Sequence, residues 1–463
     1  MARGEGASKA YAGRRAVVLG AARSGLAAAA ALARHGAQVT LSDRKQLAEL
    51  SEAAADAARH GFNLAPGGHP ERLLEGCALL VLSPGVPNSL PFVKAARAQG
   101  VPVVSEIELA FTLSPRRWVA VTGTNGKTTT TSLIHAMTVQ AGTPALLGGN
   151  IGQPLADRVE DAPDEAVVVA ELSSFQLEDV AAFKPFVAVW TNLTPDHLDR
   201  YSGIESYTAA KARIFGAMDG RDHLVSNAMD PAVERACAPA KAVRWRFARG
   251  AEVPTGAWEL GGVLYLREPG AAARELMPLG ELRLRGPHNL ENALAAACVG
   301  AALGLSDQAL RETLRGFAGV EHRLEPCGDV RGVRFVNDSK GTNVDSVLKA
   351  LQSFEEPVHL ILGGRDKDGD FTALAPLVRA RVARVYTIGE AAAKVERQLA
   401  GTAAIEPCGD LATAMRRALG AAHSGEWILL SPGCASFDQF RNYEHRGAFF
   451  KEQVALLKEE SLR

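Results

Sequence analysis

A glycine-rich turn between an apolar run and a predicted helix constrains the fold of this chain more than any other feature. Residues 118–121 are apolar and typical of a buried strand. After them come Thr122, Gly123, Thr124, Asn125, Gly126, Lys127, Thr128 and Thr129. A strand, a glycine-rich turn and a helix N-terminus direct backbone N–H groups toward one anion. Lys127 adds a charge for the β- and γ-phosphates, and Thr128 adds a hydroxyl for Mg²⁺. The stretch therefore predicts the phosphate-binding loop of an ATP-dependent enzyme.

The same turn also has a simpler interpretation. The general pattern G-x-x-x-x-G-K-[ST] has a glycine where this chain has Val121, so the loop is a variant form. A glycine turn that only caps a helix would account for Gly123 and Gly126. It would not account for a lysine followed by a run of threonines, and we therefore retain the phosphate-binding interpretation.

Strand-like runs alternate with amphipathic helical stretches along the whole chain. This alternation predicts an α/β fold with largely parallel sheets, and 463 residues are too many for one hydrophobic core. The pattern falls into three blocks, which we assign to domains at residues 1–105, 106–319 and 320–463. We expect each domain to hold a largely parallel sheet flanked by helices. The first and third would be Rossmann-like, and the central one P-loop ATPase-like.

The composition excludes several classes of function. The chain has 47% hydrophobic and 22% charged residues and a formal net charge of −1, so nothing indicates a nucleic-acid partner. The most apolar-looking run, residues 26–33, is far shorter than a bilayer span of about 20 residues. The six cysteines are widely scattered, as expected of reduced thiols rather than zinc or redox motifs. We expect a cytoplasmic, monomeric enzyme without a membrane span.

A second glycine turn, at residues 20–25, lies where a dinucleotide fingerprint would begin. Its second glycine is replaced by Ala22, which disfavours an NAD site. Asp43 follows the next predicted strand at about the twenty-residue spacing of a ribose-binding carboxylate. A nucleotide other than NAD fits this turn better, and a plain βα turn without a ligand fits equally well.

Three further residues could join the phosphate loop. Glu171 follows the apolar run 167–170, and His197 lies in the loop after the run 187–190. Because the carboxyl ends of parallel strands share one edge of a sheet, both side chains should emerge beside the phosphate loop. Lys211 lies on a predicted helix. From the residues alone, a solvated carboxylate, a solvated histidine and an exposed lysine remain open alternatives.

Several spaced segments resemble the motifs of the Mur ligase family over nearly the full length of the chain: 123–129, 171–178, 196–199, 288–293 and 322–323. Further segments resemble the members that add glutamate, D-glutamate in particular: 337–343, 362–370 and 430–440. The resemblance implies an ATP-dependent ligase that phosphorylates the free carboxylate of UDP-N-acetylmuramoyl-L-alanine. The amine of glutamate would then attack the acyl phosphate and release phosphate.

The resemblance also implies cofactors and site residues. The cofactors would be ATP, two Mg²⁺ ions and a carbamylated Lys211. The metal ligands would be Thr128, Glu171, His197 and Lys211, and the catalytic residues Lys127, His197 and Lys211. Residues 123–129 would bind ATP together with Asn292, Arg323 and Asp338. The UDP-linked substrate would contact Ser24, Asp43, Arg44, Ser83, Asn150 and His197. Glutamate would contact Lys340, Thr342, Lys367, Ser436 and Tyr443. Ligands spread over three domains would also imply domain closure.

Other functions remain compatible with parts of the sequence. Among ligases, the chain could add L-glutamate, could be a sister Mur ligase for another amino acid, or could resemble a folylpolyglutamate synthetase. Outside that class, it could be a nucleotide-binding switch or a dehydrogenase. Ala22 disfavours the dehydrogenase, and the set of Glu171, His197 and Lys211 disfavours the switch. A solvated loop charge remains an alternative for Lys367.

Overall fold

The structure is a computed structural model that describes residues 11–196, 200–284 and 286–461. The chain divides into two compact units. The first runs to Glu281 and includes Glu291–Gly316, and the second holds Leu282–Leu290 and the chain from Phe317 onward. Three separate sheets flanked by helices make up these units. The predicted α/β class with three largely parallel sheets is confirmed, whereas the exact domain limits stay a prediction.

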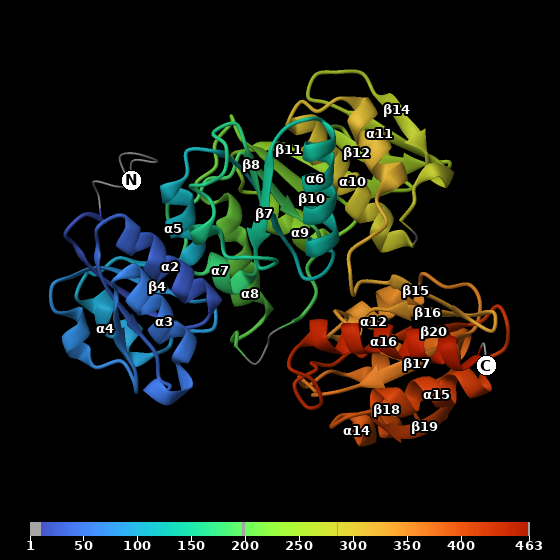
Figure 1. The fold of residues 1–463 in the computed structure, drawn as a ribbon. Helices are drawn as coiled ribbons and strands as arrows, with labels where there is room; N and C mark the ends of the chain where they lie inside the picture. Colours follow the sequence, from blue (N-terminus) through green and yellow to red (C-terminus); the bar gives the residue numbers. More distant parts are fainter. Residues whose placement is uncertain (1–10, 197–199, 285, 462–463) are drawn as a thin grey trace. The chain divides into compact units, whose positions relative to one another are not determined.

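The first sheet has five strands in the order β3-β2-β1-β4-β5, and its four pairings are parallel (Figure 1). The strands are β1 (Arg15–Leu19), β2 (Gln38–Ser42), β3 (Asn63–Ala65), β4 (Cys77–Leu82) and β5 (Val103–Ser105). The helices that follow them are α2 (Arg23–Arg34), η1 (Leu47–Glu49), α3 (Ser51–His60), η2 (Glu71–Leu74), α4 (Pro91–Ala98) and α5 (Glu106–Leu113). This strand order is that of a doubly wound nucleotide-binding sheet.

Strand β1 shows why helices cover both faces of this sheet. Val18 belongs to the apolar cluster that includes Ala28 of α2. Its neighbour Val17 belongs to a different cluster, which includes Phe92 and Val93 of α4. Successive side chains of a strand point to opposite faces, so the apolar run of a parallel strand needs a helix on each side.

The central sheet has nine strands in the order β14-β13-β12-β11-β10-β9-β6-β8-β7. They are β6 (Arg117–Thr122), β7 (Ala145–Gly149), β8 (Val167–Glu171), β9 (Val187–Trp190), β10 (His223–Asn227), β11 (Val243–Arg249), β12 (Gly256–Leu260), β13 (Val263–Arg267) and β14 (Arg274–Pro278). The pairings from β7 to β12 are parallel, whereas β12, β13 and β14 pair antiparallel. This antiparallel extension was not predicted, because its half-exposed strands carry charged residues and give a weak apolar signal.

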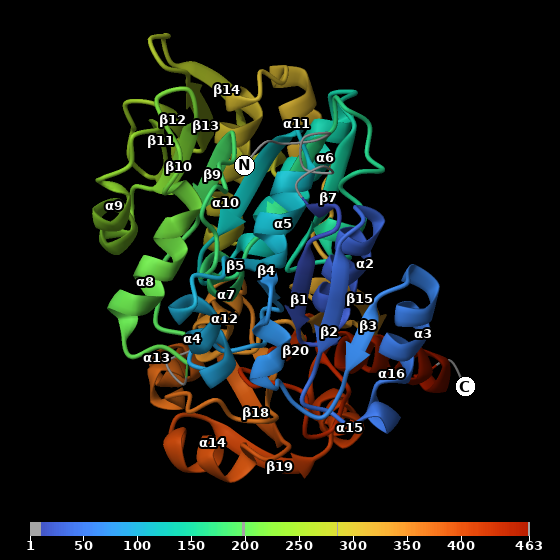
Figure 2. The same ribbon diagram turned by 90° about the vertical axis from the view of Figure 1, so that its left-hand side faces the viewer.

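The helices of the central region are α6 (Lys127–Gln140), η3 (Leu155–Asp157), α7 (Ser174–Leu177), α8 (Ile204–Ala212), η4 (Arg213–Phe215), α9 (Pro231–Cys237), η5 (Leu279–Glu281), α10 (Pro287–Ala302) and α11 (Asp307–Gly316). Helix α6 packs against β6 and β8, and α11 packs against α6 (Figure 2). The helix predicted after the phosphate loop is therefore α6, which begins at Lys127.

The third sheet has six strands in the order β15-β16-β20-β17-β18-β19. They are β15 (Glu325–Val330), β16 (Val333–Asn337), β17 (Val358–Gly363), β18 (Val382–Ile388), β19 (Ala404–Gly409) and β20 (Trp427–Leu430). Its helices are α12 (Val344–Leu351), η6 (Phe371–Leu374), α13 (Ala375–Arg381), α14 (Ala392–Gln398), α15 (Leu411–Ala421) and α16 (Tyr443–Ser461). Only the edge strand β15 pairs antiparallel to its neighbour.

Strand β17 lies inside this sheet and contributes side chains to two apolar clusters, one on each face. Leu360 packs with Phe371 in one cluster, and Ile361 packs with Phe450 of α16 in the other. Each face of the sheet is thus covered by helices, as in the first sheet. Within the part of the chain that the structure describes, no helix is long and apolar enough to cross a membrane.

Candidate active site

Three neighbouring strands of the central sheet end beside one another. Val121 of β6 pairs with Glu171 of β8, and Thr122 pairs with Trp190 of β9. Because these strands run parallel, their carboxyl ends lie at the same edge of the sheet. The structure therefore brings the loop after β6, the Glu171 carboxyl and the start of the loop after β9 together. Val121 lies inside β6, which is why a glycine is not needed there.

Two glycines give the phosphate loop its shape. Gly123 and Gly126 have φ values of +148° and +81°, a region that other residues rarely adopt. A Cβ atom on Gly123 would lie 2.0 Å from Thr191 Oγ1, and one on Gly126 would lie 2.3 Å from Asn292 Oδ1. The chain therefore needs glycine at both positions for its backbone and for the close approach of neighbouring side chains.

The loop after β9 supports the phosphate loop from one side. The Asn125 N–H donates to Asn192 Oδ1 at 2.9 Å, and Asn192 Nδ2 donates back to the Asn125 carbonyl at 2.9 Å. Thr191 Oγ1 donates to the same carbonyl at 2.7 Å. The Thr124 hydroxyl donates to the Thr194 carbonyl at 3.0 Å. These bonds hold the loop in a fixed conformation before any ligand enters.

Lys127 is the first residue of α6 and folds back over the phosphate loop. Its Nζ donates to the carbonyls of Gly123 at 3.1 Å and Thr124 at 2.8 Å. The next residue, Thr128, is 4% exposed and lies in the first turn of the same helix. An ammonium, a hydroxyl and a helix N-terminus thus face one loop, which suits a phosphate and its metal ion.

Glu171 lies buried at the end of β8. Only 1% of its surface is exposed, so a solvated carboxylate, one of the open alternatives, is wrong. Asn150 contacts it twice: Nδ2 donates to Glu171 Oε1 at 2.9 Å, and the Asn150 N–H donates to the Glu171 carbonyl at 2.8 Å. The structure therefore places Asn150, expected at the UDP-linked substrate, directly on Glu171.

Lys211 is also buried, with 1% of its surface exposed, so an exposed lysine is wrong as well. Its Nζ donates to the Gly123 carbonyl at 2.7 Å and lies 4.5 Å from the centre of the Tyr207 ring. Burial, and then the charge of Lys127, hold the pKa of Lys211 well below its usual value, although Asp196 and Glu171 oppose this. A buried amine of this kind is readily held in its neutral form.

The residues at this edge suit a magnesium ion. Mg²⁺ prefers oxygen ligands, and the Glu171 carboxylate and Thr128 hydroxyl supply them beside the phosphate loop. The ammonium of Lys211 is not a metal ligand, but its carbamate would be. His197, expected as a catalytic, metal-binding and substrate-binding residue, lies outside the described residues.

The residues expected at ATP fall in two places. Asn292 of α10 accepts a hydrogen bond from Thr130 of α6 at 3.2 Å, so it lies next to the phosphate-loop helix. Arg323 and Asp338 belong to the second unit. Burial raises the pKa of Asp338 to about 6, although Arg323 opposes this. The Asp338 carboxylate accepts from Ser431 Oγ at 2.8 Å.

The residues expected at the UDP group gather around the first glycine turn. Asp43 accepts from the N–H groups of Ala21 at 2.7 Å and Lys45 at 2.9 Å. Burial alone would raise the pKa of Asp43, but these two donors hold it below its usual value. Ser83 Oγ donates to the Gly20 carbonyl at 2.9 Å. Ser24 is half-buried in the first turn of α2, while Arg44 is exposed beside Asp43.

The residues expected at glutamate belong to the second unit, four of them in loops and Tyr443 at the start of α16. Ser436 is buried, Lys367 is exposed, and Thr342 is half-buried. Lys340 Nζ lies 5.3 Å from the centre of the Tyr443 ring. The exposed position of Lys367 leaves both of its interpretations open.

Arg446 of α16 was not predicted as a functional residue, although it is only 1% exposed. Its Nε donates to Ser339 Oγ at 3.0 Å, and its Nη2 donates to the carbonyls of Ser339 at 2.9 Å and Cys434 at 3.1 Å. These partners lie next to Lys340 and close in sequence to Ser436. A lone arginine in a helix gives no signal of such burial in the sequence.

One cluster of possible metal ligands lies outside the predicted site. The acidic and imidazole side chains of Glu321, His322 and Glu325 lie within 4.8 Å of one another. Lys451 already pairs with both carboxylates, so the cluster is an ion-paired group rather than a metal site.

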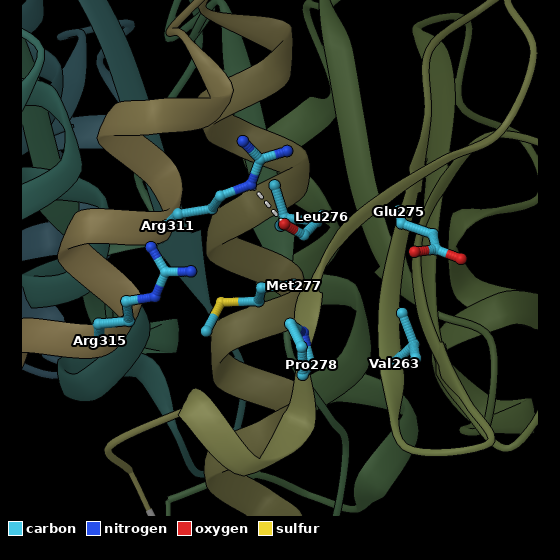
Figure 3. A pocket seen from close by; sticks show the side chains of 7 residues that line it. All are labelled: Val263, Glu275, Leu276, Met277, Pro278, Arg311 and Arg315. Carbon is cyan, nitrogen blue, oxygen red and sulfur yellow. Dashed lines mark hydrogen bonds between the residues drawn. The ribbon is translucent and has the colours of Figure 1, made fainter.

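A separate pocket of about 410 Å³ lies between α11 and the antiparallel extension (Figure 3). It is lined by Val263, Glu275, Leu276, Met277, Pro278, Arg311 and Arg315. Its two arginines are engaged: Arg311 donates to the Leu276 carbonyl and Arg315 pairs with Glu281 at 2.5 Å. The predicted site residues are not among those that line it.

Three family models match the chain in succession. They are described as the Mur ligase MurD-like N-terminal domain (residues 14–105), the Mur ligase middle domain (residues 121–300) and the Mur ligase, glutamate ligase domain (residues 322–434). Together they cover the regions of all three sheets.

Curated relatives match over nearly the whole chain. The UDP-N-acetylmuramoylalanine–D-glutamate ligase of Acidobacterium capsulatum is 44% identical over 443 residues, which is 96% of either protein. The protein of that name from Koribacter versatilis is 44% identical over 449 residues, 97% of this chain and 98% of the relative. The protein of that name from Shouchella clausii is 40% identical over 444 residues, which are 96% of this chain and 97% of the relative.

Solved structures share the fold at lower identity. UDP-N-acetylmuramate-alanine ligase MurC of Thermotoga maritima matches with a TM-score of 0.58 and 19% identity, covering 96% of this chain and 99% of that one. MurF of Acinetobacter baumannii matches with a TM-score of 0.59 and 17% identity, covering 98% of this chain and 92% of that one.

Proposed function

The chain belongs to the Mur ligase family, and from that premise we propose that it joins D-glutamate to UDP-N-acetylmuramoyl-L-alanine with cleavage of ATP, a step of peptidoglycan precursor synthesis. The meeting of the phosphate loop, Glu171 and Lys211 at one edge of the central sheet carries this proposal. The names of the relatives support glutamate as the amino acid and its D form.

The proposed reaction has two steps. A carboxylate oxygen of the alanyl group attacks the γ-phosphorus of ATP, the bond to the β-phosphate oxygen breaks, and ADP leaves. The glutamate amine then attacks the acyl carbon, the carbon–oxygen bond to phosphate breaks, and the amine gives up a proton. The products are the amide, ADP and inorganic phosphate.

The first step requires two negatively charged groups to approach each other. Positioning and charge neutralisation therefore dominate catalysis of phosphoryl transfer. The backbone N–H groups of residues 123–129 and the ammonium of Lys127 would bind the phosphates. Asn292 would hold the adenine side of ATP, with Arg323 and Asp338 at its phosphates and ribose.

Mur ligases use ATP with Mg²⁺, which neutralises the phosphate charge when it is bound. For this chain we propose two ions, held by Thr128, Glu171, His197 and a carbamylated Lys211. Carbamylation joins the neutral amine to CO₂ with loss of a proton, and it replaces a positive group by a carboxylate-like ligand. The burial of Lys211 beside the phosphate loop supports this modification, because an ammonium there is poorly solvated.

The two remaining substrates would bind at the first and third sheets. Ser24, Asp43, Arg44 and Ser83 would face the UDP group, with Asn150 and His197 nearer the reacting carboxylate. Lys340, Thr342, Lys367, Ser436 and Tyr443 would hold glutamate. A lysine and hydroxyl groups suit its two carboxylates. We further propose that the enzyme acts as a monomer in the cytoplasm, where ATP is abundant.

Transfer of isotope tests this mechanism. UDP-N-acetylmuramoyl-L-alanine with ¹⁸O in its free carboxylate is turned over with unlabelled ATP, Mg²⁺ and D-glutamate. An acyl phosphate requires one ¹⁸O atom to leave with each inorganic phosphate, which mass spectrometry detects. Phosphate released without the label would show that ATP is cleaved by another route and would overturn the proposal.

A further inference from the structure

An arginine and a glutamate outside the proposed ligand set tie the first sheet to the central one. Glu178 follows α7, seven positions after Glu171. Its Oε2 accepts from Arg200 Nη2 at 3.1 Å and from Asn88 Nδ2 at 2.9 Å. Its Oε1 accepts from the Tyr201 hydroxyl at 2.6 Å. The carboxylate is therefore hydrogen-bonded on both oxygens.

Arg200 reaches in the opposite direction, to the loop that follows β4. Its Nη1 donates to the Pro84 carbonyl at 2.9 Å, and its Nη2 donates to the Val86 carbonyl at 3.4 Å. The guanidinium also lies 4.0 Å from the centre of the Phe175 ring. One side chain thus joins the loop after β4, the segment after β8 and the loop after β9.

A second set of bonds holds the same loop from its other end. Asn88 Nδ2 donates to Asp179 Oδ2 at 3.0 Å, and Arg97 of α4 pairs with Asp179 Oδ1 at 2.5 Å. The Ser105 N–H donates to the Asp179 carbonyl at 2.9 Å. Residues 84–88, which begin directly after Ser83, are therefore held at both ends, by Arg200 in the loop after β9 and by Glu178 and Asp179 after α7.

Aromatic rings continue this connection toward Lys211. Phe175 stacks on Tyr201 with ring centres 5.9 Å apart, and Tyr201 lies 5.4 Å from Tyr207. Lys211 Nζ lies over the Tyr207 ring. The side chains of Arg200, Phe175, Tyr201, Tyr207 and Lys211 thus form one continuous row.

Net stabilisation alone is a weak explanation for the pair of Arg200 and Glu178. The side chains of Arg200 and Glu178 are 19% and 13% exposed. Ion pairs withdrawn from water give little net stability, because desolvation offsets their attraction. What a fully hydrogen-bonded pair does provide is one fixed geometry between the segments that it joins.

We propose that Arg200 and Glu178 are positioning residues that hold the loop after β4, and with it the UDP end of the substrate, in register with the Glu171 edge of the central sheet. The inference rests on the proposed function, since it assumes that the substrate spans Ser83 and Glu171. Errors of about 1 Å in such placement can cost about a hundredfold in rate.

An arginine is required for this geometry. Its planar group reaches two carbonyls and a carboxylate while it lies on the Phe175 ring. The single ammonium of a lysine cannot span these acceptors in one plane. Arg200→Lys keeps the charge and should therefore behave like Arg200→Ala.

The experiment compares Arg200→Lys, Arg200→Ala and Glu178→Gln with wild type. Arg221→Ala is the control, because Arg221 is an 85%-exposed arginine that pairs with Asp219 on the surface. We expect each of the first three variants to raise KM for UDP-N-acetylmuramoyl-L-alanine about tenfold or more. A change of this size corresponds to the loss of about one charge-assisted hydrogen bond. KM for glutamate should stay unchanged, and added guanidinium ion should partly restore Arg200→Ala.

If the variants merely lost stability, their melting temperature would fall, but KM for the UDP-linked substrate would not rise separately from KM for glutamate. Unchanged KM for the UDP-linked substrate in Arg200→Lys and Arg200→Ala, with wild type active, would overturn the positioning role and leave the ligase function standing. A wild-type enzyme that releases no phosphate from ATP with both substrates present would instead overturn the proposed function, and this inference with it.

Discussion

The Nζ atom of Lys211 donates a 2.7 Å hydrogen bond to the carbonyl oxygen of Gly123, 88 positions away in the chain. The Lys127 ammonium donates to the same carbonyl at 3.1 Å. Two lysines therefore converge on the Gly123 carbonyl of the phosphate loop; Lys211 is buried and Lys127 is half-buried. The charge of Lys127 lowers the pKa of Lys211, so a change that makes Lys211 neutral or negative is favoured.

Lys211→Ala should lower kcat by about a hundredfold or more, the usual effect of losing one charge-stabilising group at a reacting centre. Short-chain carboxylic acids should restore part of the activity, because a carboxylate can take the place of the carbamate. Steady-state phosphate release measures both effects. Lys184→Ala is the control, since Lys184 pairs with Asp219 and Asp222, away from the phosphate loop in sequence. Full activity of Lys211→Ala without added acid would rule out the carbamate.

Gly126→Ala should weaken ATP binding by tenfold or more, or about 1.4 kcal/mol. Its new Cβ would lie 2.3 Å from Asn292 Oδ1, so either the phosphate loop or Asn292 must move. Gly142→Ala is a matched control, because Gly142 has φ +79° against +81° for Gly126, while among the described residues no atom outside its chain neighbours lies within 4 Å of the new Cβ. Calorimetric titration with ATP compares the two. Equal affinity in both variants would mean that the loop tolerates the contact.

Glu106→Gln should make the protein more stable at pH 8 than wild type, with little difference at pH 4. Burial raises the pKa of Glu106 from 4.5 to about 7, and Oε2 has no hydrogen-bond partner among the described residues. The unfolded chain loses this proton near pH 4.5 and the folded one near pH 7, so wild-type stability falls as pH rises through that window. The shift corresponds to about 3 kcal/mol.

Urea denaturation between pH 4 and 8 measures this difference. Glu108→Gln serves as the contrast, since the Glu108 carboxylate accepts from the backbone N–H groups of Ala181, Ala182 and Phe183. That variant should be less stable than wild type at neutral pH. A pH-independent difference between wild type and Glu106→Gln would contradict the account of Glu106.

Arg446→Met should destabilise the second unit by about 3 kcal/mol or more, since it leaves buried carbonyls without a donor. It should also raise KM for glutamate, because its partners lie beside Lys340 and near Ser436. Arg416→Met is the control, as Arg416 pairs with Glu460 in a 53%-exposed contact and should cost about 1 kcal/mol at most. Denaturant unfolding and glutamate titrations measure the two effects, and equal stability of the two variants would contradict the role of Arg446.

The parallel cores of the sheets could be predicted from the sequence because their strands are buried on both faces. The run 167–170 became β8 (Val167–Glu171), and 187–190 became β9 (Val187–Trp190). Such strands are continuous apolar runs that need no tertiary context to be recognised. The antiparallel extension from β12 to β14 lies partly in solvent, and its mixed composition hid it.

Burial of single charged side chains could not be predicted in this way. Lys211 and Arg446 lie on helices whose composition is compatible with exposure, and only packing against distant loops encloses them. The family resemblance drew attention to Lys211, while nothing drew attention to Arg446 or Arg200. The bonds that matter here join residues that are far apart in the chain, which no local pattern reports.

Release of phosphate from ATP tests the central claim most directly. Purified protein is given ATP and Mg²⁺ with UDP-N-acetylmuramoyl-L-alanine, D-glutamate, both or neither, and with L-glutamate in place of D-glutamate. We predict stoichiometric ADP, phosphate and ligated product only when the UDP-linked substrate and D-glutamate are both present. Phosphate release that needs neither substrate, or none when both are present, would contradict the ligase assignment, and preference for L-glutamate would contradict the assigned substrate.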